Sequence, residues 1–117
     1  MRSIQFYESA SGKCPVQDFL DGLNGKQARK VVWVLQLIRE LPRPPIRFFK
    51  KLAGTELWEV RAALGSDAFR LLGFLDGDQL VVLTSGFAKK TQKIPKQEIE
   101  TALKRRKNYY MNDGRSR

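Results

Sequence analysis

The chain has 117 residues and a formal net charge of +10, from 22 Lys and Arg against 12 Asp and Glu. The length suits a single domain, the hydrophobic fraction of 42% is enough for a core, and no apolar run reaches the ~18 residues of a membrane span. There is no His and Cys14 is the one cysteine, which excludes a zinc constellation, a Ser-His or Cys-His dyad and an internal disulfide. We therefore expect a protein of the reducing cytoplasm, with no signal peptide and no metal or cofactor.

The first third of the chain predicts a strand and two helices. Alternating residues in Arg2–Glu8 are typical of a strand. A proline at the first helical position favours a short helix over Pro15–Leu23. Asn24 with Gln27 three residues later forms a capping box for a second helix, Gly25–Leu41, which a proline-rich stretch ends. The two helices are predicted to form an αα-hairpin.

The middle of the chain predicts β structure. Aromatic and branched residues dominate Leu57–Ala62, Ala68–Leu75 and Leu80–Thr84. The turn pairs Gly65-Ser66 and Asp76-Gly77 separate these segments. The pattern indicates a meander of three strands joined by hairpins.

The last quarter predicts a helix from Pro95 to about Tyr110. The element order is then β-α-α-β-β-β-α, an α+β fold with a curved, mainly antiparallel four-stranded sheet packed against the αα-hairpin and the C-terminal helix. We expect one domain over residues 1–112 and a frayed basic tail over residues 113–117.

The first predicted hairpin opposes two like charges. A two-residue turn at Gly65-Ser66 places Arg61 directly opposite Arg70 on one face of the sheet. Like charges opposed in this way destabilise a sheet by up to ~1 kcal/mol. Either the carboxylate of Glu59, two residues from Arg61 on the same face, neutralises the pair or an anion belongs between the arginines.

The second predicted hairpin extends this layout. A turn at Asp76-Gly77 places Leu83 beside Arg70 and Ser85 beside Ala68. The opposite face is then the core that the helices cover, and the arginine face is open. The predicted core positions are Trp58, Val60, Phe69, Leu71, Leu80 and Val82.

Most of the excess charge lies near the C-terminus. Residues 86–117 hold ten basic and three acidic residues, a net of +7. A basic block of this kind indicates a polyanionic partner such as nucleic acid, although a solvated helix or tail has the same composition. The candidate nucleic-acid-binding residues are Lys50, Lys93, Lys96, Lys104, Arg105, Arg106 and Lys107.

Several segments in a fixed order resemble a known family. They are Phe49–Gly54, Leu57–Arg61, Phe69-Arg70, Gly86–Lys90, and Lys93–Pro95 followed by Glu98, Ile99 and Ala102. This series resembles the RelE/ParE toxin superfamily, in particular its HigB-like, phage-derived branch. The resemblance covers about residues 45–110 in detail, and the two leading helices agree with it in order and length.

The resemblance implies a toxin of a type II toxin–antitoxin pair. It implies a ribosome-dependent endoribonuclease that cuts mRNA without a metal, by attack of the 2′-hydroxyl on the adjacent phosphate. The implied partners are ribosome-bound mRNA, rRNA and a cognate antitoxin, expected to be a helix-turn-helix protein, and no membrane is implied. The implied catalytic residues are Lys51, Arg61, Arg70, Lys89 and Lys90. A lysine crowded by cations has a lowered pKa, so Lys51 and Lys90 are the candidates for proton transfer.

An alternative follows from the same resemblance. ParE-like relatives inhibit DNA gyrase without cutting RNA, and a phage-borne relative that only binds nucleic acid would fit the same composition. Some family members use His or a C-terminal Tyr as the proton carrier. This chain has no His, and Tyr109 and Tyr110 are predicted to pack beneath the last helix.

Overall fold

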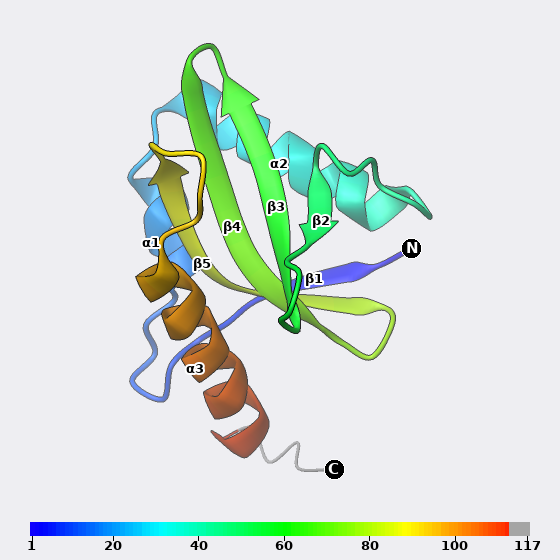
Figure 1. Ribbon diagram of the computed structural model, residues 1–117, viewed down its shortest axis with the longest axis vertical. Helices are drawn as coiled ribbons and strands as arrows, with labels where there is room; N and C mark the ends of the chain where they lie inside the picture. The colour runs from blue at the N-terminus through cyan, green and yellow to red at the C-terminus, as the bar shows by residue number, and fades with distance from the viewer. Residues whose placement is uncertain (113–117) are drawn as a thin grey trace.

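Within residues 1–112, which the computed structural model describes, five strands form one mixed sheet with helices on both of its faces (Figure 1). The predicted tail at residues 113–117 lies outside the described residues. In chain order the elements are β1 (Ser3–Phe6), α1 (Pro15–Asp21), α2 (Gly25–Glu40), β2 (Phe49–Lys51), β3 (Leu57–Leu64), β4 (Asp67–Asp76), β5 (Leu80–Lys89) and α3 (Lys96–Asn112). The α+β class and the predicted helices are confirmed.

The sheet has one strand more than the sequence indicates. Its order is β1-β5-β4-β3-β2, with β1 parallel to β5 and every other pair antiparallel. The predicted four-stranded sheet is wrong because Phe49–Lys51 forms an edge strand, β2. With three residues it is too short to show an alternating pattern.

The predicted cap of α2 is present in full. The backbone N–H of Gln27 donates to Asn24 Oδ1 at 2.9 Å, and the backbone N–H of Asn24 donates to Gln27 Oε1 at 3.1 Å. These bonds satisfy N–H groups that a helix start otherwise leaves unpaired. The apolar side of α2 packs on one face of the sheet. Its residues Val31, Val34, Leu35 and Ile38 join a core there with Val60, Phe69 and Leu71.

α3 forms a second core on the other face. Its Ala102 and Tyr109 pack with Leu57, Leu72 and Phe74 from the sheet. Leu80 and Val82 also belong to this second core, so their predicted place on the same face as Val60 and Leu71 is wrong. The arginine face is therefore open at one end only, because α3 covers the other end (Figure 1).

The β3–β4 hairpin has the predicted register. Arg61 pairs with Arg70 and Leu64 pairs with Asp67. Gly65 has a φ of 62°, a value that glycine adopts without strain, and no other residue type among those described has a positive φ. A glycine at the first turn position with a negative φ at the second is the pattern of a type II′ turn. The two arginines are therefore opposed, as predicted.

The β4–β5 register differs from the prediction. Asp76 pairs with Leu80 across three loop residues, whereas the prediction has a two-residue turn. Leu72 pairs with Ser85 and Gly73 pairs with Leu83, which leaves Thr84 as an extra residue in β5. This bulge reverses the alternation of β5, so Phe87 lies beside Arg70 and Lys89 beside Ala68.

β5 also extends five residues beyond its predicted end at Thr84. Gly86, which lies just beyond the predicted end, is in the strand and packs against α1. A Cβ at Gly86 would lie 2.5 Å from Cδ2 of Phe19. Glycine is needed here because α1 packs directly on the strand backbone.

Candidate functional site

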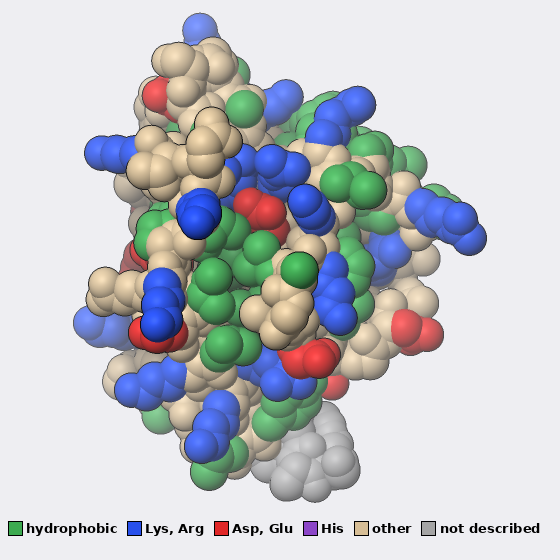
Figure 2. Space-filling model, viewed as in Figure 1, with side chains coloured by type: hydrophobic (Ala, Val, Ile, Leu, Met, Phe, Trp, Pro, Cys, Tyr) green, Lys and Arg blue, Asp and Glu red, His purple; other side chains and the backbone are tan. Residues whose placement is uncertain are grey.

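Basic side chains line an open hollow at the end of the sheet face that α3 leaves uncovered. Its volume is about 460 Å³. We call it the arginine hollow, and its lining residues are Arg61, Ala68, Arg70, Lys89, Lys90, Thr91 and Gln92. Figure 2 shows basic side chains gathered around an acidic one over β3 and β4. The structure thus brings together four of the five residues predicted to be catalytic.

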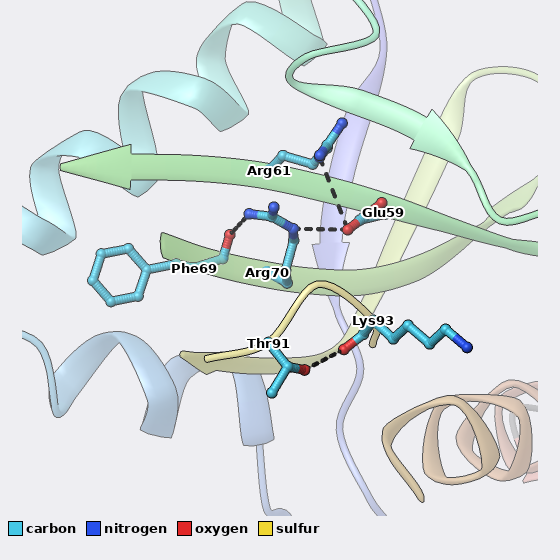
Figure 3. Close-up of polar contacts among 6 residues, drawn as sticks. All are labelled: Glu59, Arg61, Phe69, Arg70, Thr91 and Lys93. Carbon is cyan, nitrogen blue, oxygen red and sulfur yellow. Dashed lines mark hydrogen bonds and ion pairs between the residues drawn. The ribbon is translucent and has the colours of Figure 1, made fainter. Parts of the chain in front are cut away.

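A buried carboxylate lies beside the two opposed arginines. Glu59 is 5% exposed, and its Oε2 lies 2.7 Å from Nε of Arg70 and 3.9 Å from Nε of Arg61 (Figure 3). Of the two alternatives that the sequence left open, neutralisation by Glu59 is the one observed. It is unequal, because the short contact goes to Arg70 alone.

Arg70 is fixed in place from two sides. Besides the ion pair with Glu59, its Nη1 donates to the carbonyl oxygen of Phe69 at 2.9 Å. Burial lowers the pKa of Arg70, the negative charge of Glu59 opposes that shift, and the positive charge of Arg61 adds to it. An arginine stays protonated in proteins despite such a shift, so Arg70 presents a fixed positive charge to the hollow.

Lys89 is the hollow lysine with a perturbed pKa. Burial lowers the pKa of its amine, and the positive charge of Arg70 lowers it further. Lys89 shares the face of Arg70 because the bulge at Thr84 sets the alternation of β5. The cation crowding that we predicted for Lys51 or Lys90 is thus found at Lys89.

Lys50 and Lys51 differ in position. Lys50 pairs with Glu59 and so lies on the face of the two arginines, whereas Lys51 pairs with Trp58 and has the opposite alternation. Lys51 lines a separate hollow with Gly54, Thr55, Glu56 and Leu103. The structure therefore does not bring Lys51 together with the other four predicted residues. Of the two lysines, Lys50 is the one on the face of Arg61 and Arg70.

The segment between β5 and α3, together with the first residue of α3, carries further exposed cations. Lys93 and Lys96 are both exposed. The hydroxyl of Thr91 donates to the carbonyl oxygen of Lys93 at 2.8 Å and closes a tight bend next to the arginine hollow (Figure 3). These two lysines are placed to extend the basic surface toward α3.

The basic run on α3 divides into outward and inward residues. Lys104 and Lys107 are exposed, as expected for phosphate contacts. Nη1 of Arg105 donates to the carbonyl oxygen of Thr84 at 2.9 Å and lies 3.1 Å from Oγ of Ser85. The guanidinium of Arg106 lies 5.7 Å from the ring centre of Phe74 and 5.4 Å from that of Tyr110. Both arginines thus hold α3 on the sheet, so half of this predicted binding run is structural.

The two tyrosines of α3 lie at the covered end of the face. The hydroxyl of Tyr109 donates to Oδ2 of Asp76 at 2.7 Å, and that of Tyr110 lies 3.5 Å from Oδ1. Burial raises the pKa of Tyr110, and the charge of Asp76 raises it further. The predicted packing of both tyrosines beneath the helix is confirmed.

Sequence reasoning missed four contributors to the site. Thr91 and Gln92 line the hollow but carry no motif, and the bulge at Thr84 has no local signature. Arg105 satisfies the carbonyl of Thr84, which a basic run on a helix does not reveal. Glu59 was not missed, because its position two residues from Arg61 on the same face made it the expected partner of the arginines.

Residues 1–112 lack a metal-binding cluster and a membrane-spanning helix. That part of the chain has no group of three His, Cys, Asp or Glu side chains arranged to hold a metal ion. None of its helices is both long enough and apolar enough to cross a membrane.

Comparison with known proteins places most of the chain in a family. No curated protein matches the sequence. Residues 18–107 match the family described as phage derived protein Gp49-like (DUF891), which is a RelE-like toxin family. This match spans α2, β2 to β5, the arginine hollow and most of α3. The chain therefore belongs to the Gp49-like family of phage-derived proteins.

Proposed function

We propose that this protein is a type II toxin that cuts mRNA on the ribosome, a metal-independent endoribonuclease of the HigB-like kind. The observation that carries the proposal is the arginine hollow, where Arg61, Arg70, Lys89 and Lys90 converge on one open space. Such a cluster is suited to a phosphodiester, because fixed cations stabilise the charge that develops on phosphorus in the transition state. The membership in a RelE-like toxin family supports the same reading.

The proposed reaction uses the RNA as its own nucleophile. The 2′-oxygen attacks the adjacent phosphorus and loses its proton to a base. The bond from phosphorus to the 5′-oxygen breaks, and that oxygen takes up a proton. The products are a 2′,3′-cyclic phosphate and a 5′-hydroxyl, so no oxidant, water or metal enters the balance.

Lys89 is the residue that we propose for the proton transfer. Its lowered pKa gives a larger neutral fraction than an ordinary lysine has, and a neutral amine accepts the 2′-hydroxyl proton. The ammonium then formed donates to the 5′-oxygen. Arg61 contacts the phosphate oxygens, Arg70 adds a fixed positive charge beside them, and Lys90 adds charge at the rim. Lys51 lies outside the hollow, so it has no step here.

The partners follow from the exposed charge. We propose that Lys50, Lys93, Lys96, Lys104 and Lys107, all exposed, contact phosphates of mRNA or rRNA. A helix-turn-helix antitoxin encoded beside the gene would restrain the toxin, and both would act in the cytoplasm, where ribosomes are.

The test is to add purified protein to a defined translation reaction and map the mRNA ends with and without ribosomes. We expect cuts within codons only when ribosomes are present. Arg61→Ala should slow cutting by about 100-fold, the cost of one lost transition-state contact. Arg39→Ala, an equal loss of charge at an exposed position of α2, should cut normally.

Other results would contradict this proposal. Cuts in naked RNA would indicate a free ribonuclease. An absence of cuts, together with inhibition in a gyrase supercoiling assay, would support the non-cleaving, ParE-like alternative. Full activity of Arg61→Ala would show that the arginine hollow is not the site.

A further inference from the structure

We infer that Glu59 is a resident counter-ion of the phosphate site: it fixes Arg70 permanently and competes with RNA phosphate for Arg61. This inference deepens the proposed function and rests on it, since it takes the arginine hollow to be where RNA phosphate binds. It makes Glu59 a positioning residue, one that fixes Arg70 and modulates phosphate binding at Arg61 without touching the reacting atoms.

The unequal distances carry the first step. Oε2 of Glu59 lies 2.7 Å from Nε of Arg70, in direct ion-pair contact, and 3.9 Å from Nε of Arg61, at the limit of such contact. The side chain of Arg70 is 9% exposed, whereas that of Arg61 is 32% exposed. Arg70 is therefore mostly buried and held by Glu59, whereas Arg61 is accessible at the surface of the hollow.

The surroundings of Glu59 carry the second step. It lies in a cross-strand row with Lys50 and Leu72, and the next position of that row is Ser85, which is buried. Its side chain is 7% exposed, so the carboxylate has little room to turn toward water. Separating it from Arg70 would leave two buried charges unpaired, which is strongly unfavourable.

An exchange at Arg61 avoids that cost. An incoming phosphate can take the guanidinium of Arg61 while Glu59 keeps its short contact with Arg70. Until RNA arrives, the carboxylate offsets the repulsion between the opposed arginines. While RNA is bound, the same negative charge repels the phosphate. Glu59 therefore stabilises the empty site and weakens RNA binding.

The test compares Glu59→Gln with the intact protein in binding a short fluorescent 2′-O-methyl oligoribonucleotide, which cannot be cleaved by its own 2′-oxygen. We expect Glu59→Gln to bind about tenfold more tightly, equivalent to ~1.4 kcal/mol. Its plot of log K against log salt should be steeper, because there is no longer a repulsion between Glu59 and the phosphate for salt to screen. Its melting temperature should fall, because Arg70 loses its counter-ion.

A matched control separates this effect from net charge. Glu40→Gln removes one negative charge at an exposed position of α2, on the other side of the sheet. It should leave both the affinity and the salt slope unchanged. Glu59→Asp keeps the charge, but its side chain is one methylene shorter, so the carboxylate lies farther from Arg61. This variant replaces Glu59→Gln in the test if Glu59→Gln does not fold. Glu59→Asp should also bind more tightly than the intact protein.

The outcomes separate the two proposals. If the intact protein binds the oligonucleotide and neither Glu59 variant binds more tightly, the counter-ion role is wrong and the proposed function stands. If Glu40→Gln gains as much affinity as Glu59→Gln, the gain is general electrostatics and the inference fails. If no variant binds, the arginine hollow is not a phosphate site and both proposals fail.

Discussion

The two ends of one sheet face make contrasting use of an acidic side chain. At the covered end, Asp76 accepts hydrogen bonds from neutral tyrosine hydroxyls beneath α3. At the open end, Glu59 lies beside two arginines next to the arginine hollow. The contrast teaches that helix coverage, rather than strand composition, divides this face into a core and a site.

The largest expected effect concerns the covered end. Phe74 is fully buried, and both α3 tyrosines pack on its ring at centroid distances of 5.2 Å and 5.6 Å. Phe74→Ala should lower the free energy of unfolding by about 3–5 kcal/mol, because it removes this packing and leaves a cavity. Urea unfolding measures the effect. Leu103→Ala, at an exposed position of α3, should lower the free energy of unfolding far less. Equal losses in the two variants would contradict the description of the covered end as a packed core.

The next largest effect is expected for the ion pair between Glu59 and Arg70 at the open end. Arg70→Met should lower the free energy of unfolding by about 3 kcal/mol, because Glu59 is left buried without its partner. Adding Glu59→Leu should restore most of that stability, since two apolar residues leave no unpaired charge. A double-mutant cycle in urea measures the coupling. If the double variant is no more stable than Arg70→Met, the pair is not the source of the loss.

A pH profile sharpens the role of the open end. With Lys89 as base, the cleavage rate should rise with pH as its amine loses a proton. The midpoint of that rise should lie below the pKa of an ordinary lysine, because burial and the charge of Arg70 lower the pKa of Lys89. Lys89→Arg keeps the charge but stays protonated, so it should cut about 100-fold more slowly with no such rise. Ribosome-dependent cleavage rates across pH measure this. An unchanged profile in Lys89→Arg would assign the proton transfer elsewhere.

The smallest effect separates the tyrosines from catalysis. Tyr109→Phe should lower the free energy of unfolding by about 1–2 kcal/mol, since it removes a hydrogen bond of 2.7 Å to a carboxylate. The cleavage rate of the folded variant should not change, because Tyr109 is held at the covered end. A loss of cleavage without a loss of stability would show instead that a tyrosine serves the open end.

Much of the candidate site could be predicted because one turn places it. Gly65-Ser66 sets the β3–β4 register by local geometry, and that register alone opposes Arg61 to Arg70. Lys51 could not be placed in the same way. Its side of the sheet depends on the pairing of the edge strand β2, and three residues carry no readable alternation.

The C-terminal basic run shows a second limit of sequence reasoning. Lys104 to Lys107 are alike in charge, yet Arg105 and Arg106 hold α3 while the two lysines face outward. Which residues of such a run point inward depends on how the helix is rotated against the sheet. That rotation is set by packing against Phe74 and the carbonyl of Thr84, which lie far away in sequence.

Local chemistry accounts for what the sequence alone decided: the helix start at the Asn24 capping box, the type II′ turn at Gly65, and the opposed arginines that follow from it. Each depends on residues a few positions apart, where backbone sterics and short hydrogen bonds dominate. The bulge at Thr84, the closure of half the face by α3, and the unequal hold of Glu59 on its two arginines were decided only in the tertiary structure. These features come from contacts between distant segments, whose energies exist only once the sheet and its helices are packed together.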